Sequence, residues 1–330
     1  MVRPPTMTDI ARRAGVSRIA VSYALNDQPG VSPATRERIR DIARELGYRA
    51  NGPALALHGA AARAVGLVML RSSAAFTVEV FRRELIAGIQ TELSARGFGL
   101  ALQFVADLDE EMAVHRRWAA ERRVDGVLLV DPGHDDPRLT ALAQIGLPAV
   151  VAGGTPEMNG VWSDDAASTG EIVDYLVAAG HRRIARVSGP EGLVHTAARN
   201  QAFRTAAADV TIVTGDYTGA DGARLTRLLL AGEPRPTAIV YDNDVMAVAG
   251  LGVAQQLGLA VPADLSIVAC EDSPLCQAVG PPLTVVKRDI VKFGRQAAWL
   301  LFERIEGGPP RSVKAAPSRL VVRRSSGPVS

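Results

Sequence analysis

Hydrophobic positions follow two different periods along this chain, and the change between them divides it near residue 60. Within residues 8–46, apolar side chains recur every three or four positions, the period of an amphipathic helix. Gly15 is placed to end a first helix, Ser17 to cap a second, and Ser32 followed by Pro33 to begin a third. The spacing predicts three short helices, of which the first two form a helix-turn-helix.

From Val65 onward, short apolar runs of strand type alternate with helical stretches. The runs VGLVML, GLALQF, DGVLLV and LPAVVA form a first round, and RIARVSG, DVTIV, TAIVY and LSIVA form a second. Alternation at this spacing indicates parallel sheets covered by helices on both faces. Two rounds predict two α/β subdomains with a crevice between them at the carboxyl ends of the strands, where small ligands bind. Helices are expected at residues 79–96, 110–122, 137–145, 165–179, 196–208, 219–231 and 244–257.

Length and composition fit a protein of more than one domain. The chain has 330 residues, of which 47% are hydrophobic and 22% charged, the usual range of a globular protein. Its net charge of +2 hides an asymmetry, because residues 1–50 contain nine arginines against five carboxylates. A basic head on a slightly acidic body indicates a polyanionic partner for the head alone.

Several classes of protein are disfavoured by what the sequence lacks. The first residues contain no apolar core of a signal peptide, and no apolar run approaches the roughly 20 residues that span a bilayer. We therefore expect a cytoplasmic protein without a membrane partner. Cys270 and Cys276 lack metal-ligand spacing and are expected to be reduced thiols. No Gly-x-Ser-x-Gly, P-loop or His-Glu-x-x-His motif occurs, so we expect no catalytic site, no metal and no cofactor.

Three stretches follow one another in the predicted head: TMTDIARRAGVSRIAVSYALN, VSPATRERI and ELGYRAN. In this order they resemble the head of the lactose-repressor/galactose-repressor family of bacterial transcription regulators, whose second helix reads the DNA major groove. By this resemblance Arg18 and Ile19 occupy two specificity positions near the start of that helix. Tyr23 stands where relatives commonly carry an arginine that contacts a base, so the preferred base there is expected to differ. Positions that contact or pack on the DNA backbone in the family are matched by Thr6, Ser17, Val21, Ser22 and Asn26.

The Gly- and Pro-containing segment NGPALALHG follows the head and has the composition of a linker. In the family this segment folds into a short helix on operator DNA, and a leucine from each subunit wedges into the minor groove. Leu57 matches that leucine, and Ala54 matches the small residue that lets two such helices approach. The alternative is a linker leucine that packs on the body.

Longer stretches of the body carry the same resemblance, among them SDDAASTGEIVDYLVAAGHRRIA, YDNDVMAVAGL and VPADLSIVACEDSPLCQAVGPPLTVVKRD. The implied fold is an N-terminal all-α head joined to a periplasmic-binding-protein-like body of two parallel-sheet subdomains. The implied boundaries are 1–51 for the head, 52–63 for the hinge and 64–330 for the effector-binding and dimerisation region. Within that region the N-subdomain takes about 64–162 and 288–316, and the C-subdomain about 163–287 and 317–330.

The resemblance also places effector-binding residues along the crevice. Arg199 matches an arginine that binds polar effector groups, and Glu271 stands where the family usually has an aspartate. Asn243 with Asp244 matches a pair at a strand end that faces the cleft, and the alternative for Asp244 is helix capping. Trp162 is expected near a crossover between the subdomains, where the alternative is a place in the core. The expected set is Phe76, Trp162, Arg199, Tyr217, Asn243 and Glu271.

Together these features predict a homodimeric transcriptional regulator, most often a repressor in this family. It is expected to bind palindromic operator DNA, with an affinity controlled by a sugar-like or nucleoside-like effector. One alternative is a binding protein of the periplasmic sugar-binding type without a DNA role, against which the basic head argues. The other is an α/β enzyme that uses the crevice, against which the missing catalytic motifs argue.

Overall fold

The computed structural model describes residues 5–25, 27–48, 61–70, 80–206 and 209–329. It divides into two compact units, Met1–Ala62 and Arg63–Ser330, each of which has its own core. Among the described residues, no helix combines the length and the apolar character that a membrane span requires.

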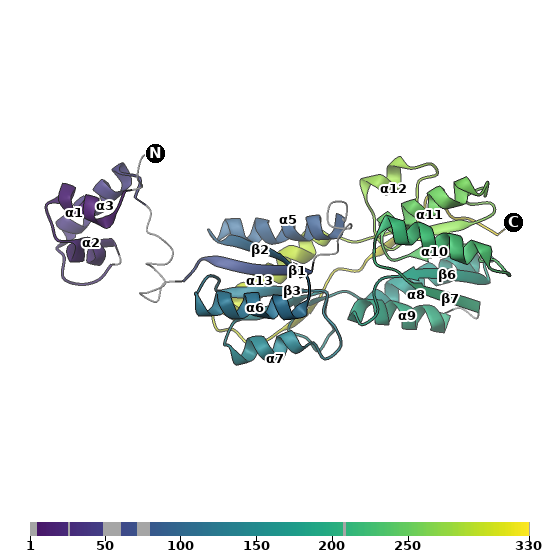
Figure 1. Ribbon diagram of the computed structural model, residues 1–330, viewed down its shortest axis with the longest axis horizontal. Coiled ribbons are helices and arrows are strands. Elements are labelled where there is room, and N and C mark those ends of the chain that lie inside the picture. Colours follow the sequence, from purple (N-terminus) through teal and green to yellow (C-terminus); the bar gives the residue numbers. More distant parts are fainter. Residues whose placement is uncertain (1–4, 26, 49–60, 71–79, 207–208, 330) are drawn as a thin grey trace. The chain divides into compact units, whose positions relative to one another are not determined.

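The first unit contains three helices, α1 (Met7–Ala14), α2 (Arg18–Leu25) and α3 (Pro33–Glu45) (Figure 1). α1 begins with a capping box, in which the Thr6 side chain accepts from the Asp9 N–H while the Asp9 carboxylate accepts from the Thr6 N–H at 2.8 Å. It ends at Gly15 with φ of 66°, a left-handed conformation that favours glycine. Small and branched side chains from all three helices fill the core, including Ile10, Ala24 and Ile39. The predicted helix-turn-helix head is confirmed.

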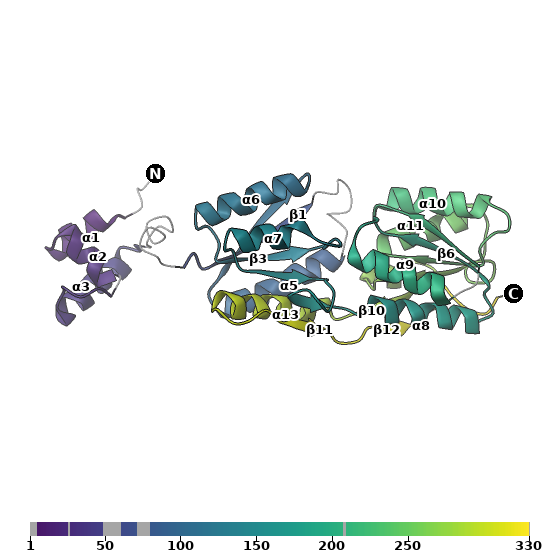
Figure 2. The same ribbon diagram turned by 90° about the horizontal axis from the view of Figure 1, so that it is seen from below.

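The second unit contains two six-stranded sheets. Pairing in the first sheet is parallel throughout, as predicted. Its spatial order is β11 (Ser312–Lys314), β5 (Gly160–Trp162), β4 (Ala149–Ala152), β3 (Gly126–Val130), β1 (Ala64–Leu70) and β2 (Gly99–Val105). Alternate residues of β1 enter different cores: Leu67 and Met69 pack with α5 (Val80–Ala95) and α13 (Ile290–Ile305), and Val68 packs with α6 (Leu108–Ala120) and α7 (Pro137–Gln144). The two helix pairs therefore cover opposite faces (Figures 1 and 2).

The second sheet repeats this plan with one difference at its edge. Helices α10 (Gly219–Ala231), α11 (Asp244–Gln256) and α12 (Pro274–Ala278) cover one face, and α8 (Asp165–Ala178) and α9 (Val194–Ala206) cover the other. Strand β12 runs antiparallel to β10, so this sheet is not purely parallel. The three-residue strands β5, β11 and β12 are too short to produce an apolar run that sequence periodicity detects. The spatial order of the second sheet is β12 (Arg319–Val321), β10 (Thr284–Lys287), β9 (Ser266–Ala269), β8 (Ala238–Tyr241), β6 (Arg183–Ser188) and β7 (Asp209–Thr214).

The chain passes between the two sheets three times, after β5, after β10 and after β11. Helix α13 follows a strand of the second sheet but packs on the first, against α5. The expected architecture of two α/β subdomains is confirmed. Residues after the strand ends and on the three crossover segments then meet at one place.

Candidate ligand cleft and DNA-binding face

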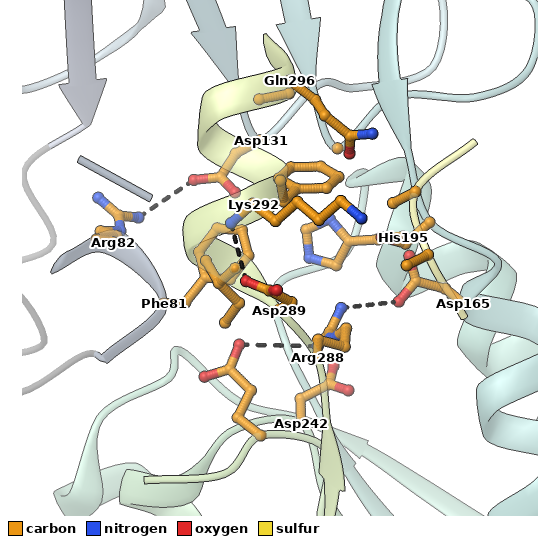
Figure 3. A pocket seen from close by; sticks show the side chains of 18 of the residues that line it. Phe81, Arg82, Asp131, Asp165, His195, Asp242, Arg288, Asp289, Lys292 and Gln296 are labelled. Carbon is orange, nitrogen blue, oxygen red and sulfur yellow. Dashed lines mark hydrogen bonds and ion pairs between the residues drawn. The ribbon is translucent and has the colours of Figure 1, made fainter. Parts of the chain in front are cut away.

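A cleft lined by both subdomains encloses about 910 Å³, including the part that is open to solvent (Figure 3). Several of its polar residues directly follow strand ends: Asp131 follows β3 and Asp242 follows β8. The carboxyl ends of parallel strands are the usual place for ligands in such sheets. Phe81 and Phe293 contribute aromatic rings from α5 and α13. The cleft therefore combines apolar faces with a charged polar lining.

Arg199 on α9 is held between two carboxylates. Its Nε donates to Asp165 Oδ1 at 2.7 Å, its Nη2 lies 2.6 Å from the same oxygen, and its Nη1 donates to Asp242 Oδ1 at 3.1 Å. Burial alone would raise the pKa of Asp165, but the cations of Arg199 and Arg288 outweigh it and lower that pKa. These contacts engage three of the five guanidinium N–H groups and leave one on each Nη for a ligand.

Asp242 is itself shared by two arginines. Arg186 on β6, which is fully buried, forms an ion pair with Asp242, and the Gly189 N–H donates to Asp242 Oδ2 at 2.5 Å. Burial would raise the pKa of Asp242, but Arg186 and Arg199 together hold it far below its ordinary value. Arg186 also donates to Asn200 Oδ1 at 2.9 Å. The position of Arg199 therefore depends on a second, deeper ion pair.

His195 and Tyr217 form a neutral hydrogen-bonding pair at the cleft wall. His195 Nε2 lies 2.9 Å from the Tyr217 hydroxyl. Burial and the nearby Arg199 cation lower the pKa of His195, so the imidazole is uncharged at neutral pH. Burial and the Asp242 carboxylate raise the pKa of Tyr217, so its hydroxyl keeps the proton. A Cβ at Gly189 would lie 2.0 Å from the Tyr217 hydroxyl, so only glycine leaves room for this ring.

Two further arginines of the cleft, Arg288 and Arg82, also face carboxylates. Arg288, on the second crossover, lies 3.5 Å from Asp165 and 3.9 Å from Glu271, and it donates to the Cys270 carbonyl at 3.1 Å. Arg82 on α5 lies 3.2 Å from Asp131 (Figure 3). The three arginines among the described lining residues therefore all have carboxylate partners, and Lys292 on α13 adds a further cation to the lining.

The structure brings together half of the expected effector residues. Arg199, Tyr217 and Glu271 line the cleft, whereas Phe76 lies outside the described residues. Trp162 lies on β5 beneath the Lys314 ammonium, which is 5.0 Å from the ring centroid, and does not line the cleft. Asn243 is buried as the N-cap of α11, where it accepts from the Met246 N–H and donates to the Tyr217 carbonyl at 2.9 Å. The expectation for these two residues is therefore corrected: Asn243 supports the backbone at Tyr217 instead of facing the ligand.

Sequence reasoning missed several lining residues. Asp165, Asp242 and Arg288 were not expected there, although Asp242 carries a usable signal because it directly follows an apolar strand. Phe293 occupies a core position of an amphipathic helix by periodicity, and nothing in that pattern separates it from its buried neighbours.

The expected DNA-binding residues occupy three different environments. Ser17, Arg18, Ile19 and Tyr23 are exposed on or next to α2, and Thr6 and Ser22 are half-buried. Val21 is fully buried in the head core, so its side chain is a core residue and not a DNA contact. Ser17 Oγ accepts from the Ala20 N–H at 3.1 Å and caps the helix. Asn26 and Leu57 lie outside the described residues.

Arg36 on α3 holds the turn that follows α2. Its guanidinium donates to the Tyr23 carbonyl at 3.2 Å, to the Gln28 carbonyl at 2.6 Å and to Asp27 Oδ1 at 3.2 Å. Arg40 also lies 2.5 Å from Asp27. Arg36 therefore positions the turn that follows α2.

Two family models match the chain. Residues 6–51 match "Bacterial regulatory proteins, lacI family", and residues 173–326 match "Periplasmic binding protein-like domain". The HTH-type transcriptional regulator CelR of Thermobifida fusca is 34% identical over 98% of both chains, and the regulator AglR of Rhizobium meliloti is 30% identical over 98% of this chain and 95% of its own.

Solved structures agree with these matches. A CelR–cellobiose complex is 31% identical, with a TM-score of 0.74 and coverage of 97% of this chain and 99% of that one. The lac repressor dimer bound to operator and the anti-inducer ONPF is 25% identical, with a TM-score of 0.84 and coverage of 98% and 99%.

Proposed function

Because this chain belongs to the lacI family of bacterial regulatory proteins, we propose that it is a sequence-specific DNA-binding transcriptional regulator with a small-molecule effector. Its named relatives are transcriptional regulators, so we assign it no catalytic reaction, and we place it in the cytoplasm, where operator DNA is. The proposed division is a head at 1–51, a hinge at 52–63 and an effector-binding region at 64–330, with subdomains changing near residues 162, 288 and 316.

We propose that the effector is a neutral polyhydroxylated molecule of sugar type. The observation that carries this proposal is the bonding of Arg199, which leaves one N–H on each of its two Nη atoms for hydroxyl oxygens of a ligand. Arg82, Arg199 and Arg288 all face carboxylates, so their charges are already balanced before a ligand binds. Phe81 and Phe293 supply apolar faces for the C–H side of a sugar ring. The solved complex of CelR with cellobiose supports the same class.

The proposed regulation follows from where the cleft lies. Its lining comes from both subdomains and from the crossover segments, so a ligand that bridges them favours one arrangement of the subdomains over another. In a dimer on a palindromic operator, that preference would reach the DNA through the hinge. We propose Leu57 as the minor-groove wedge, and Thr6, Ser17, Ser22 and Asn26 as groups near the DNA backbone.

Calorimetric titration of the full chain with a panel of sugars, nucleosides and sugar phosphates tests the effector class. We expect one or more neutral sugars to bind and to change the affinity for a DNA site selected from a random pool. Arg199→Lys keeps the cation between Asp165 and Asp242 but removes the two separate Nη donors, and we expect sugar affinity to fall by roughly tenfold to a hundredfold. DNA affinity without effector should remain unchanged. Binding of sugar phosphates in preference to the neutral sugars would overturn the proposed class.

A further inference from the structure

The exposed face of α2 carries an apolar pair. Ile19 has an exposed fraction of 65%, the highest of any large apolar side chain among the described residues. Tyr23 is 38% exposed and lies four residues further on, so the two side chains occupy the same face one helical turn apart. Arg18 is exposed next to Ile19 at the start of the helix. A face of this kind costs free energy in water unless a partner covers it.

The head holds this pair in a fixed direction. Val21 and Ala24 are fully buried against the other two helices, which sets the rotation of α2 about its axis. The Tyr23 ring packs on Gly30, where an added Cβ would lie 3.2 Å from the ring Cδ2. Arg36 binds the Tyr23 carbonyl and the turn beyond it. The ring is therefore supported from behind by its own domain.

The chemistry of DNA leaves one group for such a pair to recognise. Phosphates and most base edges present polar atoms to the major groove, which do not match an apolar side chain. The C5-methyl group of thymine is the apolar group of the major groove. Four residues of helix rise about 6 Å, whereas successive bases are about 3.4 Å apart, so the pair can reach two thymines one or two base steps apart.

We propose that Ile19 and Tyr23 form a methyl-reading pair, which selects thymine at two nearby positions in each operator half-site, beside the base that Arg18 contacts. This inference rests on the proposed DNA-binding function and specifies what the DNA partner must contain. The hydroxyl of Tyr23 is not required for the reading, because the apolar ring supplies the contact. The pair adds apolar selection to a head whose other exposed groups are mainly charged or polar.

Removal of single methyl groups from the DNA tests the proposal. The preferred operator is first selected from a random pool, and each thymine is then replaced by deoxyuridine, symmetrically in both half-sites. Affinities are measured by fluorescence anisotropy at one salt concentration, since phosphate contacts make every value depend on salt. We expect two positions per half-site at which loss of the methyl weakens binding about fourfold per half-site. The other thymines should change binding by less than twofold.

Protein variants assign each methyl group to a side chain. Ile19→Ala should weaken binding to the unmodified operator and remove the deoxyuridine effect at one of the two positions, leaving the other intact. Tyr23→Phe keeps the ring and should retain both effects. Leu228→Ala, which shortens another exposed apolar side chain in the body, serves as the matched control and should change nothing. Circular dichroism establishes that the head of each variant is folded.

The proposal would be overturned by a selected half-site without thymine at two nearby positions, by equal affinity for thymine and deoxyuridine throughout, or by survival of both deoxyuridine effects in Ile19→Ala. Loss of the effect in Tyr23→Phe would show that the hydroxyl reads the base, and would also overturn it. Failure of the full chain to prefer any sequence in the pool is a different outcome, which removes the proposed DNA-binding function itself.

Discussion

The arginines of α1 and α2 in the head and the buried arginines beside the cleft in the body play opposite roles. In the head, Arg12, Arg13 and Arg18 are exposed, and where Arg12 and Arg13 meet a carboxylate the contact lies in solvent. In the body, Arg186 and Arg199 are buried and bonded to carboxylates that are also buried. The same side chain therefore supplies an accessible positive charge in one unit and a compensated hydrogen-bonding frame in the other.

The difference indicates the partner of each unit. Exposed guanidinium groups retain their long-range attraction for a polyanion such as DNA. Buried guanidinium groups whose charge is already balanced favour a neutral ligand, because an added anion would leave the site with excess negative charge. The overall net charge of +2 does not show this difference, because it is the sum of a basic head and a slightly acidic body.

Separating the two units should have the largest effect. Deletion of residues 1–60 removes the exposed arginines and α2, so we expect specific DNA binding to fall by at least about a thousandfold. Effector affinity should stay within twofold of the full chain, because the cleft-lining residues that the structure describes run from Phe81 onward. DNA mobility shift and calorimetric titration measure the two quantities. Retained specific DNA binding would contradict the assignment of the head.

Removing one carboxylate from each unit compares a buried with an exposed ion pair. Asp242→Asn leaves Arg186 and Arg199 without their shared charge, and we expect the body to lose about 3 to 5 kcal/mol of unfolding free energy. Asp27→Asn acts on a side chain that is 75% exposed beside Arg36 and Arg40, and should cost the head less than about 1 kcal/mol. Scanning calorimetry with separate head and body transitions measures both. Equal losses would mean that burial does not distinguish the pairs.

Within the head, individual arginines should differ in how much they contribute to the sequence preference of DNA binding. Arg18→Ala is expected to weaken binding by roughly 1 to 3 kcal/mol and to relax the preference at one operator position, because Arg18 lies at the start of the reading helix. Arg38→Ala, at an exposed position on α3, is the control and should leave the sequence preference unchanged. Selection of bound sequences with each variant provides the measurement. A uniform loss on all sequences would make Arg18 a phosphate contact only.

The smallest effect concerns pH and should be confined to the body. Burial lowers the pKa of both His181 and His195, so the folded body keeps these rings neutral while the unfolded chain takes up protons below about pH 6.5. The unfolded state then binds more protons, and the unfolding free energy of the body should fall as pH drops from 7 to 5.5.

Urea unfolding followed by tryptophan fluorescence measures this change in the body alone, because Trp118, Trp162 and Trp299 all lie there. His195→Gln should reduce the slope against pH. A body whose stability stays constant over this range would contradict the neutral state of the two histidines.

Much of the fold could be predicted from the sequence, because helices and buried strands leave local periods. The capping residues Thr6 and Ser32 and the left-handed Gly15 mark helix ends that the structure contains. For the cleft, the sequence predicted the location between the two subdomains but not the full set of lining residues. Asp242 lines the cleft although the sequence did not predict it there. Asn243 beside it is the N-cap of α11 and does not line the cleft. Adjacent polar residues at a strand end point in different directions, and periodicity does not say which one enters the cleft.

The sequence by itself determined the order of the elements, the basic head and the position of the reading helix, because these follow from local spacing and charge. Only the tertiary structure decided which charges meet. Asp165 and Arg199 are 34 residues apart, and Arg186 and Asp242 are 56 apart. A buried charge must find its partner wherever the packed sheets bring one within reach, and no local pattern records that pairing. The cleft therefore owes its neutral balance to tertiary contacts, whereas the head owes its exposed charge to the sequence alone.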